Sequence, residues 1–95
     1  MFNIFNSLKV YAEKWQIKEE KPFNEAELAS IEGNGKVVIS TYGNSVQFTL
    51  KGGGHVYIPL SVDANANVGD EINPADVTII TLSKTGEEDI HRVMV

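Results

Sequence analysis

Two closely spaced turn signals constrain the fold of this 95-residue chain more than any other feature. Gly43 and Asn44 suit the positive φ values of a tight two-residue hairpin. The triple glycine Gly52–Gly54 predicts a second turn a few residues later, because a glycine run at a strand end favours a sharp reversal. The sequence therefore predicts an antiparallel meander of three strands within residues 36–60.

The two turns also predict which residues face each other. The first turn sets Val37 opposite Leu50 and Ile39 opposite Phe48, and the second sets Phe48 opposite Ile58. All of these apolar side chains then lie on one face, which we take as the core face. A slip of one residue would invert every side chain, so agreement between two separate turns supports this register. Phe48 is expected at the centre of the core, between Ile39 and Ile58.

The opposite face of the meander is expected to be polar, aromatic and free of acids. Residues 33–62 contain no Asp or Glu, although the chain carries thirteen. Lys36 and Lys51 give this stretch a charge of +2, while the flanks carry six basic and thirteen acidic residues, a charge of -7. We expect the contact surface within residues 36–59, with the candidate binding residues Lys36, Tyr42, Gln47, Lys51, His55 and Tyr57.

Residues outside the meander predict one helix and further strands. Asn24 followed by Glu27 is typical of a capping box, and Gly33 suits a left-handed closing position, so we expect a short helix over residues 24–32. Residues 8–18 fit both a strand and a helix; we favour a strand with a bulge near Glu13 and Lys14. Further strands are expected over residues 77–82 and 90–95, with loops or turns at 63–70, 73–74 and 85–86.

Pro59 bears on where the third strand of the meander lies. Proline has no amide donor and is costly in a central strand, so residues 55–60 are expected at a sheet edge, or to leave the sheet at that point. Short strands separated by turns predict a mainly β fold, a small antiparallel barrel or curled sheet of the OB or SH3-like kind with about five strands. The length allows one domain, residues 1–95.

The residue pattern does not predict catalysis or metal binding. The chain has no Cys, and no nucleophile and base pair, carboxylate dyad or cofactor loop can be assembled. A phosphate-binding loop would need a helix after Gly52–Gly54, where a strand is expected. A metal site at His55 or His91 would need a third ligand such as Asp63 or Asp89, which the spacing does not require. We expect a non-enzymatic binding protein without metal or cofactor.

Two binding hypotheses stay open. The first is single-stranded nucleic-acid binding, with Tyr42 and Tyr57 stacking on bases and Lys36, Lys51 and Lys9 near phosphates. The net charge of -5 opposes it, because phosphate binding needs clustered cations. The second is a protein-interaction or inhibitory module that uses the same face or a sheet edge, or whose acidic flanks occupy a basic groove of a partner.

The residues at the two ends of the chain lead to predictions of the cellular compartment and the oligomeric state. The first residues lack the basic start and apolar run of a signal peptide, so a cytoplasmic protein without membrane contact is expected. Apolar side chains gather at both ends of the chain. These ends are expected to bury against each other within one chain or against a second copy, and we predict a homodimer. These side chains are Phe2, Ile4, Phe5, Val93, Met94 and Val95.

Overall fold

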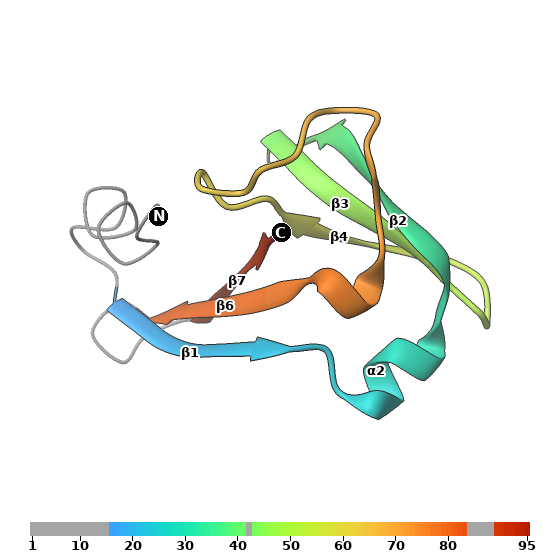
Figure 1. Cartoon of the computed structure of the whole chain (residues 1–95), viewed down its shortest axis with the longest axis horizontal. Coiled ribbons are helices and arrows are strands. Elements are labelled where there is room, and N and C mark those ends of the chain that lie inside the picture. Colours follow the sequence, from blue (N-terminus) through green and yellow to red (C-terminus); the bar gives the residue numbers. More distant parts are fainter. Residues whose placement is uncertain (1–15, 42, 84–88) are drawn as a thin grey trace.

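The computed structural model describes residues 16–41, 43–83 and 89–95 and consists mainly of β-strands (Figure 1). One antiparallel sheet has the order β1 (Gln16–Pro22), β6 (Thr78–Ser83), β7 (Asp89–Met94). The other has the order β4 (His55–Pro59), β3 (Gly43–Leu50), β2 (Ile31–Ser40), β5 (Glu71–Ile72). Helix α2 (Glu25–Ser30) connects β1 to β2, and the 3-10 helix η1 (Pro74–Asp76) precedes β6.

The two sheets meet at one corner without closing into a barrel. Leu60, just after β4, forms a parallel bridge with Val93 of β7, and the Ser61 amide donates to the Val93 carbonyl at 2.8 Å. The chain between β4 and β5 passes over the side opposite β1 and α2 (Figure 1). The mainly β, antiparallel class is confirmed, but the described residues form seven strands in two sheets, where a barrel of about five strands was expected. No continuous ladder encircles the described core, because β1 pairs with β6 and not with β2, and β5 spans only two residues.

The main hydrophobic core lies between the sheets. Its buried members come from both sheets and from the segment before β6, and they are Ile31, Val37, Val46, Phe48, Val77, Ile79 and Val93. A second cluster on the other side of β6 contains Ile80 and Leu82, with Ile17 and Met94 packed against it. The central strand β6 is thus buried on both faces, which explains why Ile79 and Ile80 are adjacent apolar residues and not part of an alternating pattern.

The predicted register of the first hairpin is wrong by four residues. Ser40 pairs with Gly43, so the chain reverses between these two residues, and Val37 pairs with Val46. Gly43 has the positive φ expected of a turn glycine, +91°, but it opens β3. The Ser40 hydroxyl donates to the Gly43 carbonyl at 3.1 Å, which closes the loop locally. Ile39 now pairs with Asn44 at the hairpin end and is 74% exposed, so its expected core position is also wrong.

The second hairpin is displaced by two residues from the prediction. Phe48 pairs with Val56, where Ile58 was expected, and Gln47 pairs with Tyr57. Both displacements are even numbers, and a shift by an even number keeps each side chain on its face. Phe48 is therefore fully buried, as expected, although both of its predicted partners are wrong.

A bulge in β2 moves the pairing further from the prediction near the start of the strand. Glu32 pairs with Thr49 and Lys36 with Gln47, so the three residues 33–35 stand opposite Phe48 alone. A local insertion of this kind changes the register without leaving a turn signal in the sequence. The Phe48 ring lies against the backbone of Gly35: a Cβ built there would be 2.5 Å from Phe48 Cε1 and 2.7 Å from Val46 Cγ1.

Helix α2 begins as predicted and ends earlier. Asn24 Oδ1 accepts from the Glu27 amide at 2.8 Å, and Glu27 Oε1 accepts from the Asn24 amide at 3.0 Å, which confirms the capping box. Ile31, and not Gly33, ends the helix, because Ile31 is buried in the core and pairs with Leu50 as the first residue of β2. Gly33 still has a positive φ, +71°, but inside the bulge.

The remaining expectations have mixed outcomes. The strand preference for residues 8–18 is confirmed for Gln16 to Lys18, and residues 8–15 lie outside the described residues. β4 is an edge strand, as Pro59 predicted. Val93 packs inside the core of its own chain, while Phe2, Ile4 and Phe5 lie outside the described residues. Within the described ranges, no helix is long and apolar enough to cross a membrane.

Phe48→Ala should lower the free energy of unfolding by about 3 to 5 kcal/mol, because it removes a large, fully buried ring. Ile39→Ala is the matched test of the register, since the side chain is exposed and should cost less than about 1 kcal/mol. Urea denaturation measures both values. A cost above about 2 kcal/mol for Ile39→Ala would contradict the pairing of Ile39 with Asn44 at the hairpin end.

Gly35→Ala should destabilise the protein by about 1 to 3 kcal/mol, because the added methyl overlaps the Phe48 ring. Gly52→Ala is the control: its Cβ would meet nothing within 4 Å, and neither glycine has a positive φ. Thermal and chemical denaturation of the two variants test this difference. Equal stability would mean that the ring does not lie on the Gly35 backbone.

Candidate functional site

The outer face of the four-stranded sheet carries the candidate binding residues in cross-strand rows. Lys36, Gln47 and Tyr57 lie opposite one another on β2, β3 and β4. Directly paired residues of antiparallel strands project to the same side, so the structure brings these three side chains together. Lys36 is exposed, Tyr57 is 48% exposed, and Gln47 between them is half-buried.

The next row contains another candidate. His55 pairs with Thr49, and His55 Nδ1 and the Thr49 hydroxyl are 3.3 Å apart. Lys51 is exposed in the turn after β3, where its amide donates to the Ser30 carbonyl at 2.9 Å. His55 therefore adjoins the central row, and Lys51 lies at the hairpin tip. Tyr42 lies outside the described residues.

Residues 33–62 contain no Asp or Glu, but the fold places carboxylates from outside this stretch beside the face. Strand β5, which the sequence analysis missed, pairs Glu71 with Lys36. The bulged start of β2 likewise places Glu32 opposite Thr49. Both carboxylates adjoin the rows that were expected to be positive, so the local charge is lower than the +2 counted along the chain. A two-residue strand leaves too short a pattern to be found from sequence.

The structure also exposes Ile39, an apolar side chain that was expected in the core. Ile39, Ser40, Thr41 and Tyr57 line an open hollow of about 320 Å³ at the hairpin end. Ile39 and Tyr57 are among the most exposed large apolar side chains of the described residues. We call the surface formed by the four residues around this hollow, Ile39, Ser40, Thr41 and Tyr57, the hairpin patch. It has no formal charge of its own.

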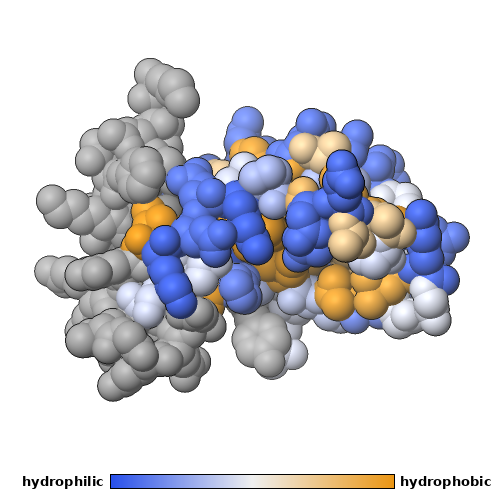
Figure 2. Space-filling model, turned by 90° about the horizontal axis from the view of Figure 1, so that it is seen from below, coloured by the Kyte–Doolittle hydropathy of each residue, from blue (hydrophilic) through white to orange (hydrophobic). Residues whose placement is uncertain are grey.

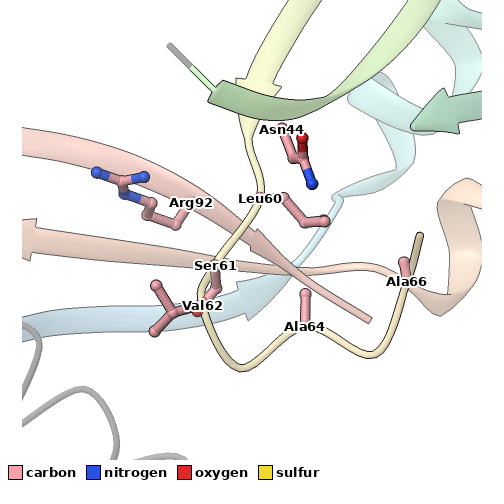
Figure 3. A pocket seen from close by; sticks show the side chains of 7 residues that line it. All are labelled: Asn44, Leu60, Ser61, Val62, Ala64, Ala66 and Arg92. Carbon is pink, nitrogen blue, oxygen red and sulfur yellow. The ribbon is translucent and has the colours of Figure 1, made fainter. Parts of the chain in front are cut away.

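A second hollow, of about 380 Å³, lies at the corner where the sheets meet (Figure 3). Its lining comes from β3, β7 and the loop after β4: Asn44, Leu60, Ser61, Val62, Ala64, Ala66 and Arg92. The Arg92 side chain extends along β7 away from the Asn44 amide, so the two polar groups do not converge (Figure 3). Asp63 Oδ2 is buried in this loop without a hydrogen-bond partner among the described residues.

The histidines lie on different sheets and each meets a threonine. His91 of β7 pairs with Thr81, and its Nδ1 is 3.0 Å from the Thr81 hydroxyl. Among the residues that the structure describes, no three His, Cys, Asp or Glu side chains form a group that could hold a metal ion. The triple glycine forms a hairpin turn, in which the Gly53 amide donates to the Leu50 carbonyl at 2.9 Å.

The polar surface on the side of β1 and α2 differs from the hairpin patch. Hydrophilic side chains cover much of this side, with apolar atoms showing between them (Figure 2). β1 contributes the exposed side chains of Lys18, Glu19 and Glu20. An alternating charged strand of this kind is typical of a solvated surface.

Comparisons of the chain with protein-family models, with curated proteins and with solved structures find no match. The candidate site is therefore assigned from its own geometry alone.

Proposed function

We propose that the protein is a non-enzymatic interaction module that binds a partner protein through the hairpin patch. The observation that carries the proposal is the exposure of Ile39 and Tyr57 around one hollow on a hydrogen-bonded sheet. Exposed apolar and aromatic side chains gathered without charge are typical of the centre of a protein interface.

Charge also favours a protein partner over a nucleic acid. The chain has a net charge of -5. On the four-stranded sheet Glu71 pairs directly with Lys36, and Glu32 pairs with Thr49 in another row. Acidic groups around a neutral patch repel phosphates and steer the patch toward neutral or basic partner surfaces. The variant in which acidic flanks occupy a basic groove is compatible with this arrangement.

The small-barrel architecture stays a hypothesis within this proposal. Two antiparallel sheets around the main core support a likeness to OB or SH3-like domains. Among the described residues these sheets are joined by one isolated bridge, between Leu60 and Val93, which does not close a barrel. Such architectures host many functions, so the likeness adds no weight to either ligand class.

The protein hypothesis predicts that Ile39→Lys and Tyr57→Ala each weaken partner binding at least tenfold, about 1.4 kcal/mol, because both remove apolar contact area at the patch. Val68→Lys is the control, since Val68 is 51% exposed and does not line the hollow. Quantitative affinity purification from nuclease-treated lysate identifies proteins lost with both patch variants but kept with the control. Titration with the purified partner then measures the affinities; unchanged affinities would refute the patch.

A second candidate, single-stranded nucleic-acid binding, is favoured by the row of Lys36, Gln47 and Tyr57. It predicts that a fluorescent oligonucleotide binds with an affinity that falls steeply as salt rises, because bound phosphates displace counterions. Tyr57→Ala should weaken this binding by about 1 to 3 kcal/mol through loss of one stacked base. Fluorescence anisotropy measures both effects, and no change in anisotropy at low salt would exclude this candidate.

A further inference from the structure

Along β4, the backbone amides and carbonyls of successive residues point alternately toward β3 and toward the open edge of the sheet. The Leu50 amide donates to the Gly54 carbonyl at 3.1 Å, and the Leu60 amide donates to the Asn44 carbonyl at 2.8 Å. These bonds flank β4 and show that its even-numbered residues direct their backbone groups toward β3. In an antiparallel ladder the intervening residues direct theirs away. The amides and carbonyls of His55 and Tyr57 therefore point out of the sheet.

Pro59 completes this arrangement. By the same alternation its nitrogen faces the open edge, so the missing donor costs no bond to β3. Among the described strands, β4 has β3 as its ladder partner. β7 also packs near β4, and the bridge between the two chain segments joins Leu60 to Val93. The open edge thus offers two donors, at His55 and Tyr57, and ends at a residue that cannot donate.

The β4 edge lacks the protection that the opposite sheet has. Edge strands are commonly guarded by charged side chains. β1, the edge of the three-stranded sheet, carries Lys18, Glu19, Glu20 and Lys21. β4 has the sequence His-Val-Tyr-Ile-Pro, without a Lys, Arg, Asp or Glu, and Val56 is 38% and Tyr57 48% exposed.

We propose that this edge pairs with β4 of a second copy of the chain, antiparallel, across a two-fold axis at Val56. In this register His55 lies opposite the partner's Tyr57, and Tyr57 lies opposite the partner's His55. Each pair exchanges two backbone hydrogen bonds, so all four outward amides of the two strands are satisfied. Pairing stops before Pro59 is required to donate.

Side chains support a second copy as the occupant. Val56 meets the partner's Val56 on one side of the joined sheet, and Tyr57 meets the partner's His55 on the other. No formally charged side chain lies in either strand, so the seam has no like-charge contact although each chain carries -5. The interface joins two four-stranded sheets into one, and it does not rest on the proposed partner binding.

Single-cysteine variants test this register, because the chain contains no Cys. In the proposed dimer Val56 forms a non-hydrogen-bonded pair with its counterpart, with Cα atoms about 4.5 Å apart, a separation that a disulfide spans. Val56→Cys should form a covalent dimer at least tenfold faster than Ile39→Cys, whose exposed position lies away from the seam. Non-reducing electrophoresis during mild oxidation measures both rates; equal rates would overturn the proposal.

Charge variants at the same position give an independent test with a fold control. Wild type should show twice the 10.4 kDa chain mass by light scattering, and Val56→Lys and Val56→Glu should each show the single mass. An equimolar mixture of the two variants should return to the double mass, because opposite charges then meet at the axis. Circular dichroism checks that each variant is folded. A wild-type monomer at millimolar concentration, or a dimer that both variants leave intact, would overturn the proposal.

Discussion

The packing of Phe48 onto the backbone of Gly35 is the contact on which the rest of the structure depends. The ring is fully buried, and no side chain larger than hydrogen fits at position 35 without displacing it. The same ring meets Phe23 edge-to-face, with ring centres 5.3 Å apart and planes at 87°. Aromatic pairs in this geometry add stabilisation beyond their buried area. Phe48 thereby joins β3, the bulge of β2 and the segment before α2.

The bulge that accommodates Phe48 also arranges the outer face. It offsets the start of β2 from its end, so that Glu32 pairs with Thr49 while Lys36 pairs with Gln47, which in turn pairs with Tyr57. β5 then adds Glu71 beside Lys36. A face whose charges alternate in this way is poorly suited to follow a phosphate backbone, and its neutral centre is better suited to an apolar or aromatic contact from a protein.

The proposed partner site and the proposed dimer edge meet at Tyr57 but use different parts of it. The side chain belongs to the hairpin patch, whereas the backbone amide and carbonyl belong to the β4 edge. A dimer through β4 would extend the sheet and bring two hairpin patches onto one joined surface. Two linked patches raise the apparent affinity for a partner that reaches both, without a new contact to either.

Features that depend on neighbouring residues could be predicted from the sequence by itself. The capping box needs only Asn24 and Glu27 three residues apart, and the edge position of β4 follows from the missing donor of Pro59. The alternation of side chains gave Phe48 its buried face, since the errors in register were even numbers. The mainly β class follows from the same alternation and from the turns.

Only the tertiary structure decided the partners and the surface charge. The bulge opposite Phe48, the exposure of Ile39 beyond the core and the pairing of Glu71 with Lys36 all join residues that share no local pattern. Which strand lies beside another depends on packing across the whole core, because backbone hydrogen bonds are nearly equivalent at every even shift of register. The sequence by itself determined which side of each hairpin strand faces inward, and packing around Phe48 decided what each strand lies against.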